Sequence, residues 1–169
     1  GSYDEKGNYT ALPCVVDRDG RVRWYYAGDN GHLLRRLNNG NMMIQREESI
    51  VEVDLLGRST GNSWKVPGGL HHDARELPNG NFLALSSAED SFYDAVVEIH
   101  RESGEIVDVW DFREIIDSER PVQPANLDEA DWFHLNAVIY DEEDDALIVS
   151  GRDQSAVVKV GRESHELIW

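Results

Sequence analysis

The sequence of 169 residues has little cysteine and little lysine. It contains one cysteine, Cys14, and three lysines. A single cysteine excludes an intrachain disulfide bond and a zinc site built from several thiolates, and we expect Cys14 to be a buried apolar side chain. Acidic residues outnumber basic ones by 33 to 16, for a net charge of −17. Nucleic acid is therefore not expected as a partner, because phosphate binding depends on clustered Lys and Arg.

Long apolar runs are also absent. No stretch approaches the roughly 20 apolar residues of a membrane-spanning helix, so we expect no membrane insertion. Apolar residues spaced by three and four, which helical repeats need, are missing too. The acidic run from Asp141 to Asp145 has neither the oxygen spacing nor the glycine of an EF-hand loop. We expect a solvated turn there rather than a calcium site, and we predict no metal and no cofactor.

What the sequence does contain is a repeat of about 40 residues. His32 is followed by the segment 37–41 (LNNGN), and 40 residues later His72 is followed by the segment 77–81 (LPNGN). A third copy starts at His134. Each copy closes with a β-branched run and a tryptophan, and half a copy precedes the first. The tryptophans are Trp24, Trp64, Trp110 and Trp169.

A period near 40 with short alternating segments and Asn-Gly turns is typical of β-propeller blades. Asn39-Gly40 and Asn79-Gly80 predict tight hairpins with positive φ at both central residues. We therefore predict an all-β fold, a β-propeller of four-stranded blades. Its predicted parts are the end of one blade at 12–26, blades at 32–66, 71–112 and 134–169, and an inserted loop at 113–133.

The number of blades is small for this architecture. Propellers close with about four to eight blades, whereas this sequence supplies about three and a half. We expect a piece of a longer protein, as Gly1-Ser2 also suggests because it is typical of a cleaved tag, or a homo-oligomer that completes the ring. In the insertion, residues 112–116 predict a helical turn, and the rest is expected to form either a lid over the channel mouth or a plain solvent loop.

The histidines at matched phase are the candidate site. In a radial array, equivalent positions such as His32, His72 and His134 point toward one axis. His71 precedes His72, and because neighbouring residues of a strand face opposite ways, only one of this pair is expected to face the axis. Register with His32 selects His72.

An arginine completes the candidate site. Arg152 follows the apolar run 147–150 and Gly151. An arginine after a strand, beside a glycine that allows close backbone approach, suits the planar recognition of an oxyanion. The alternative is a surface salt bridge to one of the 33 acidic residues. His100 and His165 are expected to be structural residues of outer turns.

Two segments carry a resemblance to a known family. The sequence HLNAV at 134–138, followed by Arg152 within SGRDQSAVVKV at 150–160, resembles the corresponding stretch of bacterial aryl-sulfate sulfotransferases. His72-Asp73 with LPNGN is similar to another blade of that family. The likeness runs over most of residues 32–169, and the unit from His134 to Arg152 is its most specific part. The family is a six-bladed propeller that transfers a sulfuryl group between phenols by a ping-pong route through a sulfated histidine.

The resemblance implies an aryl sulfate donor, a phenolic acceptor and a periplasmic or secreted location. It implies catalytic roles for His134, Arg152 and His72, and substrate-binding roles for His71, Asn136 and His32. The family's nucleophilic histidine lies further along the chain, beyond Arg152, and no residue here corresponds to it. We therefore expect no turnover by this chain alone. Because Arg152 would lower the pKa of a neighbouring histidine, His72 or His134 is expected to donate a hydrogen bond to sulfate without necessarily carrying a full charge.

A second function stays open at this point. Propellers host many unrelated functions, so the chain can also be a non-catalytic module that binds a protein or a carbohydrate. The two hypotheses differ in whether His72, His134 and Arg152 converge on one place. A separation of more than about 10 Å between their side chains would favour the binding module.

Overall fold

The computed structural model describes residues 2–3, 9–10, 12–28, 31–88, 91–117, 119 and 131–169. Within them the regular secondary structure is almost entirely β, as the sequence predicts, with one short helix, α1 (Phe112–Ile115). This helix confirms the helical turn expected at the start of the insertion. The residues of the predicted lid or loop between 120 and 130 lie outside the described part of the chain.

The strands form antiparallel sheets in which neighbours in sequence are neighbours in space. Two short pairs come first: β1 (Ser2–Tyr3) with β2 (Tyr9–Thr10), and β3 (Cys14–Val16) with β4 (Val22–Tyr25). The next sheet contains β5 (Leu34–Arg36), β6 (Met42–Arg46), β7 (Ser49–Val53) and β8 (Ser59–Lys65). It is followed by β9 (Ala74–Glu76), β10 (Phe82–Ala88), β11 (Ser91–Ile99) and β12 (Ile106–Asp111). The last sheet contains β13 (Leu135–Asp141), β14 (Ala146–Gly151) and β15 (Ala156–Gly161).

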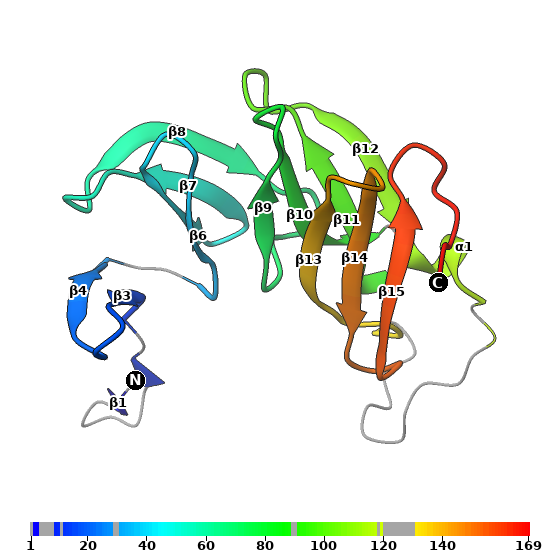
Figure 1. The fold of residues 1–169 in the computed structure, drawn as a ribbon, viewed down its shortest axis with the longest axis horizontal. Helices are drawn as coiled ribbons and strands as arrows, with labels where there is room; N and C mark the ends of the chain where they lie inside the picture. The colour runs from blue at the N-terminus through cyan, green and yellow to red at the C-terminus, as the bar shows by residue number, and fades with distance from the viewer. Residues whose placement is uncertain are drawn as a thin grey trace.

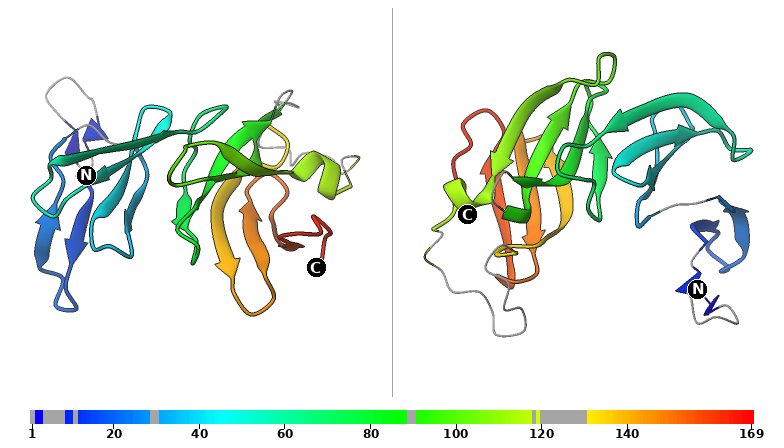
Figure 2. Two further views of the ribbon diagram at one scale, coloured as in Figure 1. Left: turned by 90° about the horizontal axis from the view of Figure 1, so that it is seen from above. Right: turned by 180° about the vertical axis from the view of Figure 1, so that it is seen from behind.

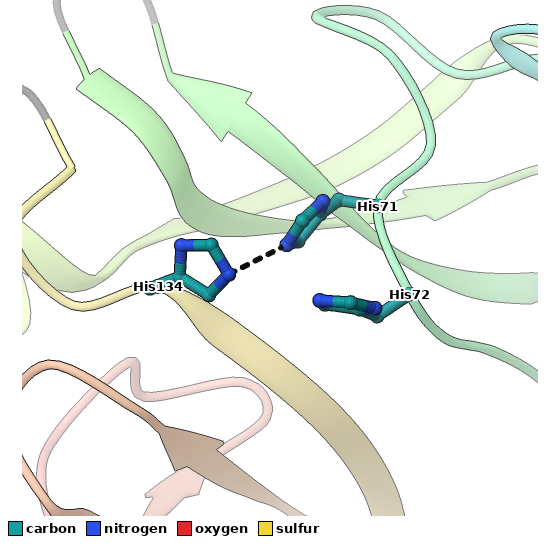
Figure 3. Close-up of side chains that lie close together, drawn as sticks. All are labelled: His71, His72 and His134. Carbon is teal, nitrogen blue, oxygen red and sulfur yellow. Dashed lines mark hydrogen bonds between the residues drawn. The ribbon is translucent and has the colours of Figure 1, made fainter. Parts of the chain in front are cut away.

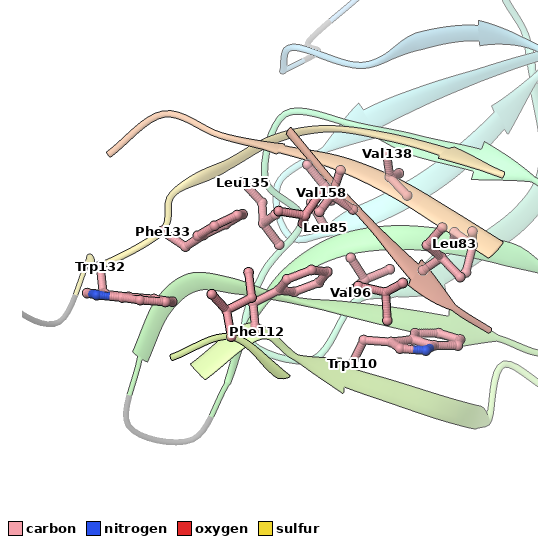
Figure 4. Close-up of a cluster of buried hydrophobic side chains, with 14 of the residues drawn as sticks. Leu83, Leu85, Val96, Trp110, Phe112, Trp132, Phe133, Leu135, Val138 and Val158 are labelled. Carbon is pink, nitrogen blue, oxygen red and sulfur yellow. The ribbon is translucent and has the colours of Figure 1, made fainter. Parts of the chain in front are cut away.

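Successive sheets lie beside one another in chain order (Figure 1, Figure 2). From β3–β4 onward, a cluster of hydrophobic side chains lies between each sheet and the next, and the largest cluster joins the sheet β9–β12 to the sheet β13–β15 (Figure 4). Trp110, Phe112 and Phe133 are among its fully buried members. Since burying one such side chain contributes about 1.5–3 kcal/mol, these clusters fix each sheet against its neighbour.

The hairpins predicted at Asn39-Gly40 and Asn79-Gly80 are present, but the predicted turn type is wrong. In each turn only the glycine has positive φ, +90° at Gly40 and +89° at Gly80. The Gly40 amide donates to the carbonyl oxygen of Leu37 at 2.9 Å. This is the three-residue hairpin loop with glycine in the left-handed position, so a single glycine meets the conformational requirement.

The tryptophans of the repeat link each sheet to the next one. The indole Nε1 of Trp24 donates to the carbonyl oxygen of Leu55 at 2.8 Å. The corresponding bonds run from Trp64 to Arg101 at 2.7 Å and from Trp110 to Arg162 at 3.2 Å. Each acceptor lies in the turn after the third strand of the following sheet. The recurring tryptophan is therefore a structural feature of the repeat.

Buried carboxylates lie at one equivalent position of two sheets. Glu52 in β7 and Glu98 in β11 are each 1% exposed. Their carboxylates accept hydrogen bonds from side-chain amides of the preceding turn, Asn39 and Asn41 for Glu52 and Asn79 and Asn81 for Glu98. An arginine of the next sheet completes each site, with Arg101 at 3.5 Å from Glu52 and Arg162 at 2.8 Å from Glu98. Buried charges need this pairing, which explains the asparagines of the repeated turn.

The last sheet, which has three strands instead of four, has the opposite charge at this position. Lys159 in β15 faces Ile148 of the adjacent strand, as Glu98 faces Leu83. Its ammonium donates to Asp141 at 2.8 Å and also to Asp144. The turn predicted at Asp141 to Asp145 is present, but these two carboxylates bind a buried lysine rather than being only solvated. The buried lysine needs acceptors, so carboxylates occupy this turn, whereas the buried glutamates of the other two sheets need donors and are bound by asparagine amides.

The expectation that Cys14 is buried is wrong. Cys14 is exposed, as are Val15 and Val16 beside it. The reason is that β3 pairs with β4 alone in a sheet of two strands, so this strand has little to pack against.

Candidate functional site

The candidate histidines lie at equivalent places in three successive sheets. His32 precedes β5, His71 and His72 precede β9, and His134 precedes β13. Figure 3 shows His71, His72 and His134 on these entry segments, with their rings turned toward one another. The first strands of neighbouring sheets thus bring together residues that are 63 positions apart in the sequence.

The rings form one cluster. Nε2 of His71 lies 3.2 Å from Nε2 of His134. The ring centroid of His72 lies 3.9 Å from that of His71 and 5.8 Å from that of His134. His32, which is exposed, continues the cluster with its centroid 5.3 Å from that of His72. The predicted convergence of His72 and His134 is confirmed.

The prediction that only one of His71 and His72 faces the cluster is wrong. Both contribute a ring nitrogen to a group that includes His134. The alternation rule fails because the pair precedes β9 and is not part of a strand, and because His72 has a left-handed backbone with φ of +55°. The ring of His71 also stacks on that of Tyr93 at 3.7 Å. No pattern in the sequence indicates Tyr93, because it belongs to β11 and to no repeated motif.

A buried carboxylate holds the backbone of His134. Asp94 is fully buried, and its Oδ1 accepts hydrogen bonds from the backbone amides of Phe133 at 2.8 Å and His134 at 2.9 Å. Arg113 pairs with the same carboxylate at 3.2 Å. His134 has a left-handed backbone with φ of +54°, which costs free energy for a non-glycine residue and persists only where its surroundings impose it. Asp94 is therefore part of the framework of the site.

A second buried carboxylate ties the entry strands together. Asp73, next to His72, accepts a hydrogen bond from Nη2 of Arg35 at 2.9 Å and one from the backbone amide of Val138 at 3.3 Å. Arg75 lies within ion-pairing distance at 3.6 Å. These partners belong to β5, β9 and β13. One side chain thus fixes the relative position of the three segments that carry the histidines.

Two carboxylates connect Arg152 to the cluster. Nδ1 of His134 lies 2.8 Å from both carboxylate oxygens of Asp131. Nη2 of Arg152 donates to Asp131 at 3.4 Å, and Nε donates to Asp153 at 2.6 Å. Arg152 therefore reaches the cluster as predicted, although through Asp131 rather than by contact with a histidine. The alternative of a salt bridge is also realised, because both of its partners are acidic.

Asp131 also selects the tautomer of the His134 ring. An ionised carboxylate accepts a hydrogen bond, so it favours the tautomer with the proton on Nδ1. Nε2 of His134 then accepts, and Nε2 of His71 donates across the 3.2 Å contact. Sequence reasoning missed this carboxylate, although its place three residues before His134 is a readable signal.

Burial is the main cause of low histidine pKa values here. Burial first, and then positive charge on His72, His134, His32 and Arg152, lower the pKa of His71 to about 3. The pKa of His72 is lowered by burial and then by His32 and His134. Asp153 raises the pKa of Arg152 by hydrogen bonding to it. At neutral pH the site therefore combines the uncharged rings of His71 and His72 with a permanent cation, Arg152.

The remaining candidates lie outside the cluster. Asn136 is exposed at a bulge of β13, where the register with β14 shifts, and a substrate role for it stays a prediction. His100 contacts Ser103 at 3.0 Å and His165 contacts Asp108 at 3.0 Å. Both lie in turns beyond the third strands, as expected for structural residues.

The fold and the site together define a class of protein: an all-β chain of repeated antiparallel sheets that gathers imidazoles, a guanidinium and carboxylates where successive sheets begin. A sequence model of the arylsulfotransferase (ASST) family matches residues 3–169. The chain belongs to this family.

Two curated relatives and one solved structure are similar to the chain. It is 25% identical to an arylsulfate sulfotransferase AssT of Escherichia coli O6:H1 and 27% identical to one of Lelliottia amnigena. Each alignment is 209 positions long and covers 88% of this chain. The chain spans about a third of the length of these relatives, 34% in each case. A crystal structure of a protein of unknown function from Bacteroides caccae superposes with a TM-score of 0.61 at 16% identity. The superposition covers 94% of this chain and 53% of that one, which supports the fold.

Among the described residues, no helix is long and apolar enough to cross a membrane.

Proposed function

We propose that the chain is part of a six-bladed β-propeller that transfers a sulfuryl group from an aryl sulfate ester to a phenol through a sulfated histidine. Membership of the arylsulfotransferase family supports sulfuryl transfer in general. The observation that carries the site is the 3.2 Å approach of His71 to His134, with His72 and Arg152 beside them. The ring nitrogens of His71, His72 and His134 lie within 4.8 Å of one another, closer than the separation of about 10 Å that would favour a non-catalytic binding module, and Asp131 links Arg152 to His134.

The proposed roles follow from the charge of the transferred group. Sulfuryl transfer, like phosphoryl transfer, spreads negative charge over the equatorial oxygens, and fixed donors around them stabilise the transition state. His72 donates a ring N–H group to a sulfuryl oxygen, and His71 can turn toward the substrate the N–H that Nε2 of His134 otherwise accepts. His134 thereby positions this donor, and His32 and Asn136 contact the rest of the substrate. The sulfur–oxygen bond to the aryl group breaks as a bond to histidine nitrogen forms, and a phenolate oxygen then takes the sulfuryl group from that nitrogen.

Arg152 supplies the positive charge in this proposal. Asp153 orients its guanidinium through two hydrogen bonds, at 2.6 and 3.0 Å. The bond to Asp131 is longer, at 3.4 Å, so a sulfate oxygen can replace it at small cost. The net charge of −17 would repel an anionic ester at long range, but the Debye length of about 8 Å at physiological ionic strength lets the local cation dominate.

We place the nucleophilic histidine beyond Arg152 in the complete protein, as the resemblance implies. The chain of 169 residues should then bind p-nitrophenyl sulfate without releasing nitrophenolate. Isothermal titration calorimetry in the presence of a chelator measures the binding. Arg152→Ala should weaken it about 10- to 150-fold, the effect of losing a charged hydrogen bond worth about 1.5–3 kcal/mol.

Arg18→Ala is the matched control, since the side chain of Arg18, in the turn between β3 and β4, is 92% exposed. Equal binding by both variants would contradict the site. Turnover by the chain alone would instead contradict the place given to the nucleophile.

A further inference from the structure

We infer that His71, His72 and His134 form a binding site for a divalent transition-metal ion, Zn²⁺ above all, with one imidazole nitrogen from each residue and a fourth position open to water. This inference goes beyond the proposed sulfuryl transfer and does not depend on it. It also departs from the sequence-based expectation of no metal, which rested on the lack of thiolates and of an EF-hand loop.

The distances fit one ion. The ligand nitrogens of the three histidines all lie within 4.8 Å of one another. Zn–N bonds of about 2.0–2.1 Å in a tetrahedral site place two ligand nitrogens about 3.3 Å apart. Nε2 of His71 and Nε2 of His134 are 3.2 Å apart and face each other (Figure 3). An ion between them would take the place of the proton that they share, and that proton would move to Nδ1 of His71 or to solvent.

The surroundings of His134 match those of a metal ligand. Histidines that bind metals almost always donate the other ring N–H to a carboxylate or carbonyl group, which orients the ring and fixes its tautomer. Asp131 accepts from Nδ1 of His134 at 2.8 Å, so Nε2 is left as the nitrogen that can coordinate.

The ligands are held in place by the protein. Asp94 fixes the backbone of His134, the ring of Tyr93 stacks on His71, and the left-handed backbone of His72 brings two neighbouring rings to the same side. A site whose ligands are already positioned loses little conformational freedom when an ion binds.

The donor set indicates which ions bind. Imidazole suits zinc, copper, nickel and cobalt, whereas calcium and magnesium require oxygen ligands. A second group of donors, Asp131, His134 and Asp153, is also close together. Both of its carboxylates pair with Arg152, and this cation opposes a metal ion there. The three-histidine group is therefore the better site.

The test uses the complete 169-residue chain after dialysis against a chelator. Titration with ZnCl₂ in a calorimeter should give one ion per chain, and CoCl₂ should give the visible absorption of a four-coordinate cobalt(II) site. His71→Ala, His72→Ala and His134→Ala should each weaken zinc binding more than about 100-fold. Asp131→Asn should weaken it about 10- to 100-fold, the usual effect of losing an outer partner of a metal ligand.

His100→Ala and His165→Ala are the matched controls, because both residues are histidines outside the cluster, and they should bind zinc like the unaltered chain. Circular dichroism checks that every variant is folded, and a cobalt titration of Asp131→Asn, which keeps all three rings, serves if an alanine variant fails to fold. No zinc binding, or equal binding by the cluster variants and the controls, would overturn the inference. Binding of p-nitrophenyl sulfate in chelator tests the proposed function separately, so either idea can fail alone.

Discussion

Asp94 and His134 are 40 residues apart in sequence, and the carboxylate of Asp94 accepts a hydrogen bond from the backbone amide of His134 at 2.9 Å. Asp94 belongs to β11, whereas His134 lies at the start of the next sheet. The position of the candidate site therefore depends on a residue that does not belong to it.

Replacing Asp94 should damage both stability and the site. Asp94→Ala leaves Arg113 without this partner and removes the acceptor for buried amides of the segment before β13. Breaking a buried ion pair typically costs about 3–5 kcal/mol. Urea unfolding should show a loss of this size, and zinc and sulfate ester binding should fall together. Asp108→Ala, on the outer strand β12, is the control and should leave ligand binding unchanged.

The stability of the chain should depend on pH through His71. Its pKa is about 3 in the folded chain and 6.5 in a free histidine. Between these values the unfolded chain binds a proton that the folded chain does not, so the free energy of unfolding falls as pH falls from about 6.5 toward 3. Carboxylates with lowered pKa, such as Glu52, add a further loss at lower pH.

His71→Gln should flatten this dependence between neutral pH and about pH 4, because the proton-binding group is gone. Urea unfolding at several pH values, followed by fluorescence, measures the slope. His100→Gln should keep the slope of the unaltered chain. If the His71→Gln curve runs parallel to that of the unaltered chain, the low pKa is refuted.

Glu98 should be more important for stability than any exposed acidic residue. Glu98→Ala removes the acceptor for Asn81 at 2.8 Å and the partner of Arg162 at 2.8 Å. We expect a loss of about 3–5 kcal/mol in the free energy of unfolding. Glu98→Gln keeps an acceptor and should lose less. Glu102→Ala, in the exposed turn after β11, should change stability little, and a similar loss for it would contradict the role of Glu98.

Gly151 should not tolerate a side chain. A Cβ atom at Gly151 would overlap the buried ring of Phe133. Gly151→Ala should therefore cost about 1–3 kcal/mol, as overpacking of a core usually does, and should shift His134 next to that ring. Thermal unfolding and zinc binding measure the two effects. Ser150→Ala, one position earlier, should leave both unchanged.

Local signals in the sequence predicted much of the fold. The Asn-Gly turns indicated the hairpins, and the recurring tryptophans indicated the repeat. Both signals are local, because a turn needs glycine at the one residue with positive φ and each sheet needs an indole at one particular position. The closed propeller and the blade boundaries stay predictions. Ring closure depends on how many sheets pack together, and no local pattern of residues encodes that number.

The site could be predicted only in part. His72 and His134 share a repeat phase, which is visible in one sequence. Tyr93 and Asp94 reach the site from a neighbouring strand, and no local pattern indicates such a contact. The choice between His71 and His72 failed for a similar reason: the rule of alternating faces applies to strands, and the left-handed backbone that brings both rings together is set by tertiary contacts.

The indole bonds that link each sheet to the following one have a consequence for how such chains change over evolutionary time. Trp24, Trp64 and Trp110 each bond to the adjacent sheet, so the energetic coupling that these indoles provide is between nearest neighbours, as in other repeat proteins. Duplication or deletion of a whole unit would leave every remaining indole with an equivalent acceptor. An insertion or deletion of a few residues within a unit would instead misalign the indole bonds to the sheet before it and to the sheet after it.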